Sequence, residues 1–223
     1  MNKRRQLGFT LIELLIVIVI LTSLLTMAAM TIQTLTRQWQ ADSNRQQQQF
    51  TLYKHLDLLA TALQATIAYE VHSDAGYGFY FLGRDDGFTG VTESGIYHAG
   101  KLAVYRVLKE PTGTGKFALY YEEAAIANTP LLNAAQQLDF NFRLNIAADL
   151  DSLQFDYFGW PDVTTRMDAA TTAKDLRRWE QHFDGIARGL QPEKIAITFD
   201  DTVWPIMLSD RMDVLKNRRL DNQ

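Results

Sequence analysis

The chain has 223 residues, of which 47% are hydrophobic and 22% charged, so it has room for a membrane anchor and one globular domain of ordinary size. Its formal net charge of −4 provides no electrostatic footprint for nucleic acid, and we expect no nucleic-acid partner. The absence of cysteine excludes thiol catalysis and thiolate metal sites, so the domain has to be stabilised by its core alone.

The N-terminus combines a basic start with a long apolar segment. Residues 9–30 contain only five polar side chains, those of Thr10, Glu13, Thr22, Ser23 and Thr26. A helix of this length measures about 33 Å, which is enough to cross a hydrocarbon core of roughly 30 Å. The basic residues Lys3, Arg4 and Arg5 predict a cytoplasmic N-terminus and a body on the far side of the membrane.

Glu13 is the feature that an ordinary membrane anchor does not explain. It lies about one helical turn inside the apolar segment, where a carboxylate costs on the order of a few kcal/mol at mid-bilayer and less near an end. This cost predicts a partner of opposite charge.

After the basic leader the chain reads Gly8-Phe9-Thr10-Leu11-Ile12-Glu13. This run resembles the class III signal of type IV prepilins and type II secretion pseudopilins, in which a prepilin peptidase cuts after the glycine and the new N-terminal amine is methylated. The resemblance implies a leader peptide of residues 1–8, cleavage between Gly8 and Phe9, and N-methylation of Phe9. It also implies that Glu13 pairs with the amine of a neighbouring subunit and so sets the register of assembly.

Two other interpretations fit part of this segment. In a secretory signal, Thr26-Met27-Ala28 would be the small-residue cleavage site, but an acid inside the apolar region disfavours it. A plain single-pass anchor fits the length and gives no reason for Gly8 or Glu13.

A single long helix is predicted from Phe9 to about Tyr69, because no glycine or proline occurs from Phe9 through Ala75. Apolar residues recur at spacings of four and three on one face, namely Leu52, Leu56, Leu59, Leu63 and Ile67. The glutamine run at 46–49 is also typical of a low-complexity linker, although the flanking periodicity favours a helix. We therefore expect a transmembrane half at 9–30, an amphipathic half at 31–70 and a globular body at 71–223.

The body begins with a glycine- and aromatic-rich stretch at 76–83, for which we favour a packed strand over a contact surface. A loop is expected at 84–90, and strand-like patterns follow it. The predicted strands are 101–108, 117–122, 138–146, 150–158, 194–199 and 202–208. The Pro-Thr-Gly turn at 111–115 predicts that the first two form a hairpin, and Pro205 marks the last as an edge strand. A long helix followed by antiparallel strands is an α+β fold, and the resemblance implies the type IV pilin-like version of it.

The order of elements at 150–200 resembles the C-terminal body of J-type minor pseudopilins and W-type minor pilins. In those subfamilies a strand and a tryptophan-bearing segment precede a Leu-x-Pro that opens the last strand. Here Trp160 and Trp179 stand in that segment and Leu190-Gln191-Pro192 follows. The alternative is that both tryptophans are core or loop anchors.

No catalytic pattern emerges from the body. The four histidines, His55, His72, His98 and His182, have no ligand spacing, and no nucleophile or zinc motif is present. Paired carboxylates at 85–86, 122–123, 149–151 and 200–201 are more typical of solvated surface than of hydrolases. Asp85-Asp86-Gly87 and Asp149-Leu150-Asp151 are candidate Ca²⁺ loops, but neither matches the twelve-residue pattern. We expect no enzyme activity, no metal and no cofactor.

The resemblance implies a minor pilin or pseudopilin that primes filament assembly at or near the tip. Its partners would be prepilin peptidase, other pilin subunits and the inner-membrane assembly platform, with the body in the periplasm or on a filament. A tip adhesin or substrate-binding module on the same anchor is the alternative, and a membrane-anchored periplasmic enzyme is less favoured. The residues leave open whether the machine serves secretion, motility, adhesion or DNA uptake.

Overall fold

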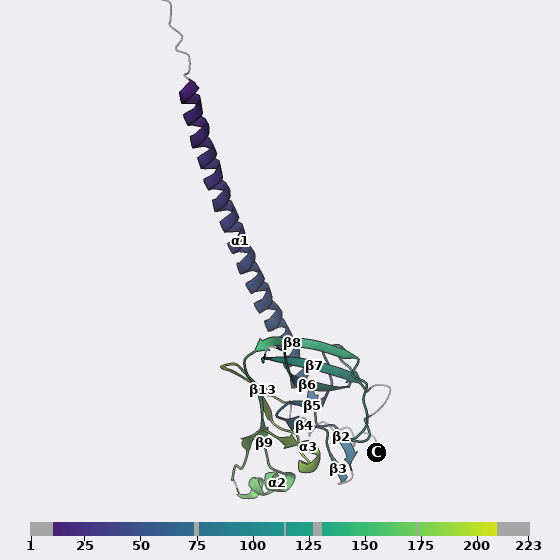
Figure 1. The fold of residues 1–223 in the computed structure, drawn as a ribbon. Coiled ribbons are helices and arrows are strands. Elements are labelled where there is room, and N and C mark those ends of the chain that lie inside the picture. The colour runs from purple at the N-terminus through teal and green to yellow at the C-terminus, as the bar shows by residue number, and fades with distance from the viewer. Residues whose placement is uncertain (1–10, 74–75, 114, 127–130, 173, 209–223) are drawn as a thin grey trace, which may run out of the picture. The chain divides into compact units, whose positions relative to one another are not determined.

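The computed structural model describes residues 11–73, 76–113, 115–126, 131–172 and 174–208 (Figure 1). Helix α1, Leu11–Gln64, is continuous through 54 residues, as the absence of glycine and proline predicts. The chain divides into two compact units, and the boundary between them falls within this helix. Thr51 ends the first unit and Leu52 begins the second. The second unit is built from antiparallel sheets, which confirms the predicted α+β, type IV pilin-like fold.

Helix α1 ends at Gln64, earlier than the predicted end near Tyr69, so the expected helical half at 31–70 is too long. The residues that follow form β1, Thr66–Ile67, which pairs with β5 through Thr66 and Thr92. Thr92 Oγ1 also donates to the carbonyl of Ala62 at 2.8 Å, in the last turn of the helix. The end of α1 is therefore set by pairing with a distant strand and not by a helix-breaking residue.

The larger sheet has seven antiparallel strands in the order β11-β4-β5-β6-β7-β8, with β1 also paired to β5. Its remaining strands are β4 Leu82–Arg84, β5 Gly87–Thr92, β6 Ala103–Pro111, β7 Phe117–Ala125, β8 Phe142–Leu150 and β11 Phe183–Asp184. The predicted hairpin is confirmed, since β6 and β7 pair from Ala103–Ala125 to Pro111–Phe117.

The second sheet has four strands in the order β10-β9-β12-β13. They are β9 Leu153–Gly159, β10 Arg178–Glu180, β12 Lys194–Phe199 and β13 Thr202–Met207. The prediction that Pro205 lies in an edge strand is confirmed, because β13 ends this order. A separate hairpin joins β2, Glu70–Ser73, to β3, Gly76–Phe79, and two short helices complete the described body, α2 Val163–Thr172 and α3 Gly185–Arg188.

Several predicted strand boundaries in the body differ from the structure, and two predicted segments are wrong over several residues. The stretch 84–90 is mostly β4 and β5, and only Asp85 and Asp86 form the turn between them. The strand predicted at 138–146 begins at Phe142, because Leu138 and Phe140 instead pack on an apolar cluster. Alternating apolar residues are consistent with a strand that begins at Leu138 and with one that begins at Phe142. The position of the apolar cluster decides between these two starts.

The main core joins the two sheets to the last turns of α1. The helix contributes Leu59, Ala62 and Leu63, while the rings of Phe88 and Phe155 meet edge-to-face at 5.5 Å between centroids. Gly83 is required at this point, since a Cβ there would lie 2.6 Å from the ring of Tyr157. A second cluster, which includes Val104 and Leu131, covers the opposite face of the larger sheet. All members of both clusters lie between residues 52 and 208.

Three fully buried tyrosines, Tyr105, Tyr121 and Tyr157, predict how the stability of the body depends on alkaline pH. Burial raises the pKa of each phenol well above its usual value of about 10. Because the pKa is higher in the folded state, the stabilisation is complete below pH 10 and is lost as the pH rises further. We expect urea unfolding followed by circular dichroism to give a free energy of unfolding that falls steadily above pH 10.

The variant Tyr105→Phe should show a shallower fall above pH 10, because it removes one of the three ionisable phenols. Tyr53→Phe is the control, since Tyr53 is exposed on α1 and its variant should follow the wild-type curve. Equal stability of the wild-type body at pH 9 and pH 11.5 would contradict this account.

Candidate functional site

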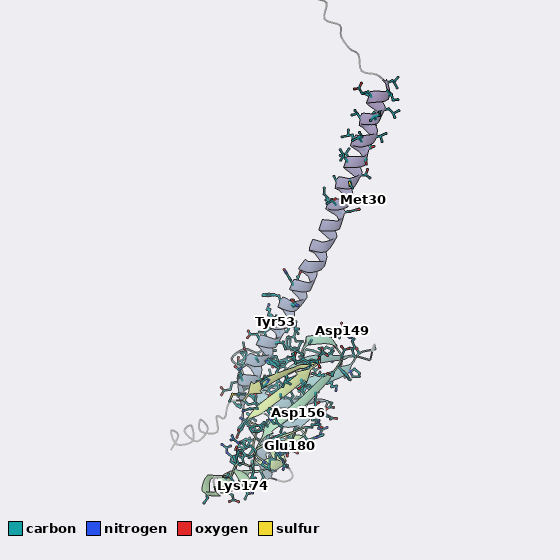
Figure 2. The ribbon with its side chains drawn as sticks, turned by 90° about the vertical axis from the view of Figure 1, so that its left-hand side faces the viewer. Met30, Tyr53, Asp149, Asp156, Lys174 and Glu180 are labelled. Atoms are coloured by element: carbon teal, nitrogen blue, oxygen red, sulfur yellow. The ribbon has the colours of Figure 1, made fainter. Side chains whose placement is uncertain are left out.

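The first part of α1 presents an uninterrupted apolar surface. The 23 residues Leu11–Gln33 have a mean hydropathy of 2.6, and none of this segment is buried within the protein. Exposure of its large apolar side chains ranges from 51% at Ile16 to 84% at Leu11. Figure 2 shows side chains of this segment, beyond the labelled Met30, pointing outward from the helix. By length and composition this helix can cross a membrane. A surface of this kind is stable only when lipid or other apolar helices cover it.

The polar side chains within this apolar segment are mostly satisfied by the helix itself. Thr22 Oγ1 donates to the carbonyl oxygen of Ile18 at 2.9 Å, and Thr31 Oγ1 donates to that of Met27 at 2.9 Å. Thr26 Oγ1 also bonds back, to the carbonyl of Thr22. These threonines therefore place no unpaired hydroxyl in an apolar environment and require no outside partner.

Glu13 differs from these threonines because it is charged. It lies in the first turn of α1 as described, where the helix dipole favours an acid, and its side chain is exposed. Its neighbours on the same helical face, Ile16 and Val17, are apolar. No ion pair joins Glu13 to another residue in the part of the chain that the structure describes. A carboxylate on an apolar helix face is suited to receive a cation from outside the subunit.

The other residues predicted for this site lie outside the described residues. These are the basic leader residues Lys3, Arg4 and Arg5 and the expected cleavage pair Gly8 and Phe9. Their roles stay predictions from the sequence. Of the predicted site, the structure places Glu13 alone, on a continuous apolar helix.

The carboxylate pair at 122–123, noted as a possible surface pair, is in fact buried and structural. Glu123 is fully buried and accepts hydrogen bonds from the backbone amide of His98 at 2.8 Å, from His98 Nδ1 at 2.7 Å and from the Tyr121 hydroxyl at 2.9 Å. It also accepts from the amide of Tyr97 at 3.1 Å. This carboxylate therefore fixes the connection between β5 and β6, and Gly95 must be glycine because a Cβ would lie 2.2 Å from it.

Glu122 is buried on the opposite face of the same strand and is paired with two arginines. Arg106 bonds to it through Nε, and an Arg143 guanidinium nitrogen lies 3.3 Å away. Both carboxylates are thus fully engaged in holding strands together. Sequence reasoning missed this role, and the available signal was two adjacent acids inside an otherwise apolar strand.

Of the two acidic loops considered for Ca²⁺, the one at 149–151 is paired with a lysine side chain. Lys116 Nζ lies 2.9 Å from a carboxylate oxygen of Asp151 and 3.3 Å from the carbonyl oxygen of Asp149. The hydrogen bond to Asp151 raises the pKa of Lys116. The positive charge next to this loop is therefore the ammonium group of Lys116. Among the residues with a described placement, no group of three or more His, Asp or Glu side chains is arranged to hold a metal.

A shallow depression of about 380 Å³ lies beside Trp160, and three of its charged side chains, those of Asp175, Arg177 and Glu193, are paired with each other. The Arg177 guanidinium lies 5.5 Å from the Trp160 ring and makes two hydrogen bonds to Asp175 as well as one to Glu193. These bonds from Arg177 lower the pKa of Asp175 to about 2. The tryptophan therefore anchors a surface ion-pair network, and the depression presents no acid–base pair suited to catalysis.

An exposed apolar helix with one acid in its first turn, followed by an antiparallel body, defines a pilin-like class of protein. Residues 3–29 match the prokaryotic N-terminal methylation motif, which includes both the basic leader and Glu13. This match supports a type IV prepilin-like signal and a protein of the type IV pilin or pseudopilin type. No curated protein and no solved structure matches the chain, so the body has no identified relative in those comparisons.

Proposed function

We propose that the protein is a structural subunit of a type IV pilus or of a type II secretion pseudopilus. The observation that supports this most directly is the methylation motif at residues 3–29, combined with an exposed 23-residue apolar helix that carries Glu13 as its only ionisable side chain. The helix fits an anchor in the inner membrane with the body in the periplasm. Later the same apolar surface packs against the helices of other subunits in a filament.

The maturation step follows from the chemistry of the motif. Prepilin peptidase removes residues 1–8 by cutting between Gly8 and Phe9, and the new amine of Phe9 is methylated. The leader then no longer contributes Lys3, Arg4 and Arg5, so the formal side-chain charge of the remaining chain becomes −7. The cationic amine enters an apolar environment, where the Glu13 carboxylate of a neighbouring subunit neutralises it and fixes the axial offset between the two subunits.

Within this class we propose a minor subunit that acts in initiation at or near the tip, together with other pilins and the inner-membrane assembly platform. The absence of cysteine supports this position, because many main fibre subunits close a C-terminal loop with a disulfide. The order of β9, Trp160, Trp179 and β12 resembles that of J-type minor pseudopilins and W-type minor pilins. Trp160 and Trp179 also have a structural role here, since each packs against a neighbouring side chain at the end of the second sheet.

The processing step is tested with Gly8→Ala. A methyl group on the residue before the cut is expected to block the peptidase, so the variant should remain at precursor length on a gel while the wild-type chain becomes shorter by eight residues. Gln6→Ala, in the same leader, is the control and should be cut normally. Normal shortening of Gly8→Ala would reject the prepilin assignment.

A further inference from the structure

The outer face of the four-stranded sheet is formed by residues that are paired across the strands. Residues that lie side by side across the strands form a row on this face. The first row contains Met207 of β13, Lys194 of β12, Phe158 of β9 and Trp179 of β10. The second row is Pro205, Ala196 and Asp156, and the third is Val203, Thr198 and Gln154. The alternate residues of β9, β12 and β13 point inward, where most of them contribute to the main core. None of the residues in the three rows belongs to either apolar cluster.

This face is unusually apolar for a sheet surface that no element among the described residues covers. An antiparallel sheet with one solvated face normally alternates apolar and polar residues, so polar residues are expected here. Instead, β13 presents Val203 at 61% exposure, Met207 at 67% and the exposed Pro205. At the other side of the sheet Trp179 is 47% exposed. Contiguous apolar surface of this kind marks an interaction site.

The edge of the sheet does not provide the contact. Because β12 pairs with one side of β13, addition of a strand would have to use its other side. Pro205 lies in the middle of that strand and has no amide hydrogen to donate. Proline at an edge is a common means of blocking strand addition. A partner at the β13 side of the sheet is therefore expected to pack on the face and not to extend the sheet from β13.

The charges on this face are complementary to each other. Lys194 and Asp156 lie diagonally across β12 and β9, since Lys194 pairs with Phe158 and Asp156 pairs with Ala196. Lys194 Nζ lies 5.2 Å from the centre of the Phe158 ring, and Asp156 accepts a hydrogen bond from the amide of Gln154. No ion pair involves either residue among the described side chains. The face therefore offers one cation and one anion, both available to a partner.

We propose that this face binds the same face of a second copy of the chain across a twofold axis. In such an isologous contact Lys194 meets the partner's Asp156, and Asp156 meets the partner's Lys194. The axis that brings these residues together lies between the two faces, crosses the midpoint of the line from Lys194 to Asp156 and is perpendicular to that line. With strands about 4.8 Å apart and alternate residues about 6.8 Å apart, this axis passes close to Pro205, Ala196, Phe158 and Trp179, so apolar side chains pack against their own copies.

The size of the face sets the strength of the contact. Three strands of six or seven residues and one of three form an area of roughly 20 by 20 Å, which is about half of what each partner contributes to a standard stable interface. The pairing is therefore weak in dilute solution. It becomes populated where the N-terminal helix confines the subunits to a membrane, which raises their effective concentration. Figure 2 views the body from the side of this sheet, with Asp156 labelled.

The chain has no cysteine, which makes disulfide trapping the direct test. The full chain carrying Pro205→Cys, oxidised mildly in its own membranes, should form a species of twice the subunit mass, because residue 205 lies next to the axis. Gln154→Cys is the matched control on the same exposed face. It lies roughly 10 Å from the axis and thus about 20 Å from its own copy, beyond the reach of a disulfide.

A charge exchange distinguishes a second copy from any other partner. In the Pro205→Cys background, Lys194→Asp puts like charges together at both symmetric positions and should lower the yield of cross-linked species by roughly fivefold or more. Adding Asp156→Lys restores both contacts and should restore the yield. Only a contact between two copies regains its cross-linking yield in this way. Each chain then carries both substitutions, so an aspartate at position 194 of one copy again meets a lysine at position 156 of the other.

Three results would overturn the proposal: no doubled species from Pro205→Cys, equal yields from Pro205→Cys and Gln154→Cys, or an adduct to a different protein in place of the doubled species. Failure of the double exchange to restore the yield would equally reject it. This surface is separate from the N-terminal site, so none of these results bears on whether the chain is a prepilin.

Discussion

Replacing Glu13 by alanine should abolish filament formation or secretion while the chain is still cleaved and inserted. Loss of one partner of an apolar-embedded ion pair costs about 3–5 kcal/mol per contact, which lowers subunit association by roughly a hundredfold or more. Insertion is not impaired, because removing a carboxylate from an apolar helix makes membrane transfer more favourable. The measurement is the amount of sheared filament or secreted substrate, together with processed protein in the membrane fraction.

Two further variants separate charge from shape at this position. Glu13→Gln keeps the size of the side chain but cannot neutralise an amine, so it should be as defective as the alanine variant. Leu14→Ala changes the adjacent, equally exposed residue of the same turn and should retain most assembly. Wild-type filament or secretion levels with Glu13→Gln would remove the role assigned to this carboxylate.

Replacing Glu123 by alanine should lower the free energy of unfolding of the body strongly, and more than Glu123→Gln or Glu110→Ala. The change removes the acceptor for the hydroxyl of Tyr121 and for the amides of Tyr97 and His98. Buried donors without partners cost about 1–3 kcal/mol each, although solvent can reach part of this loop, so we expect a total loss of about 3–5 kcal/mol. Urea unfolding of a soluble chain beginning near residue 34 measures it, since both apolar clusters lie within residues 52–208.

Matched variants test whether burial is the cause. Glu123→Gln retains one acceptor oxygen at the same place and should lose only about 1–2 kcal/mol. Glu110→Ala removes an acid that is half exposed and paired to Arg143, and such surface pairs contribute less than about 1 kcal/mol. If Glu123→Ala and Glu110→Ala lowered the free energy of unfolding equally, the buried carboxylate would not be the anchor of the β5–β6 connection.

The N-terminal site could be proposed from the sequence because its signal is local. The basic leader, Gly8 and the single acid at Glu13 occupy one short stretch, and the length of the apolar run determines its ability to cross a membrane. The absence of glycine and proline likewise predicted the continuity of α1. Period-two alternation located β12 fully and β13 to within one residue.

Other features depended on contacts between distant residues. The end of α1 at Gln64 follows from the pairing of Thr66 with Thr92, and no residue near position 64 indicates it. In the same way, the start of β8 depends on the second apolar cluster, which draws Leu138 and Phe140 away from the predicted strand. The short strands β10 and β11 carry too few residues to show any period.

The sequence by itself thus indicated a pilin-like class of protein, a helix able to cross a membrane and a proposed assembly residue, because the methylation motif and the apolar span form one contiguous segment of chain. Only the tertiary structure decided which of the paired carboxylates are buried and which face of the second sheet is apolar. Burial of Glu123 depends on a loop that precedes it by 25 residues, and the outer face joins residues from four strands that the chain visits at different times. Such properties arise from register and packing, which a linear pattern does not contain.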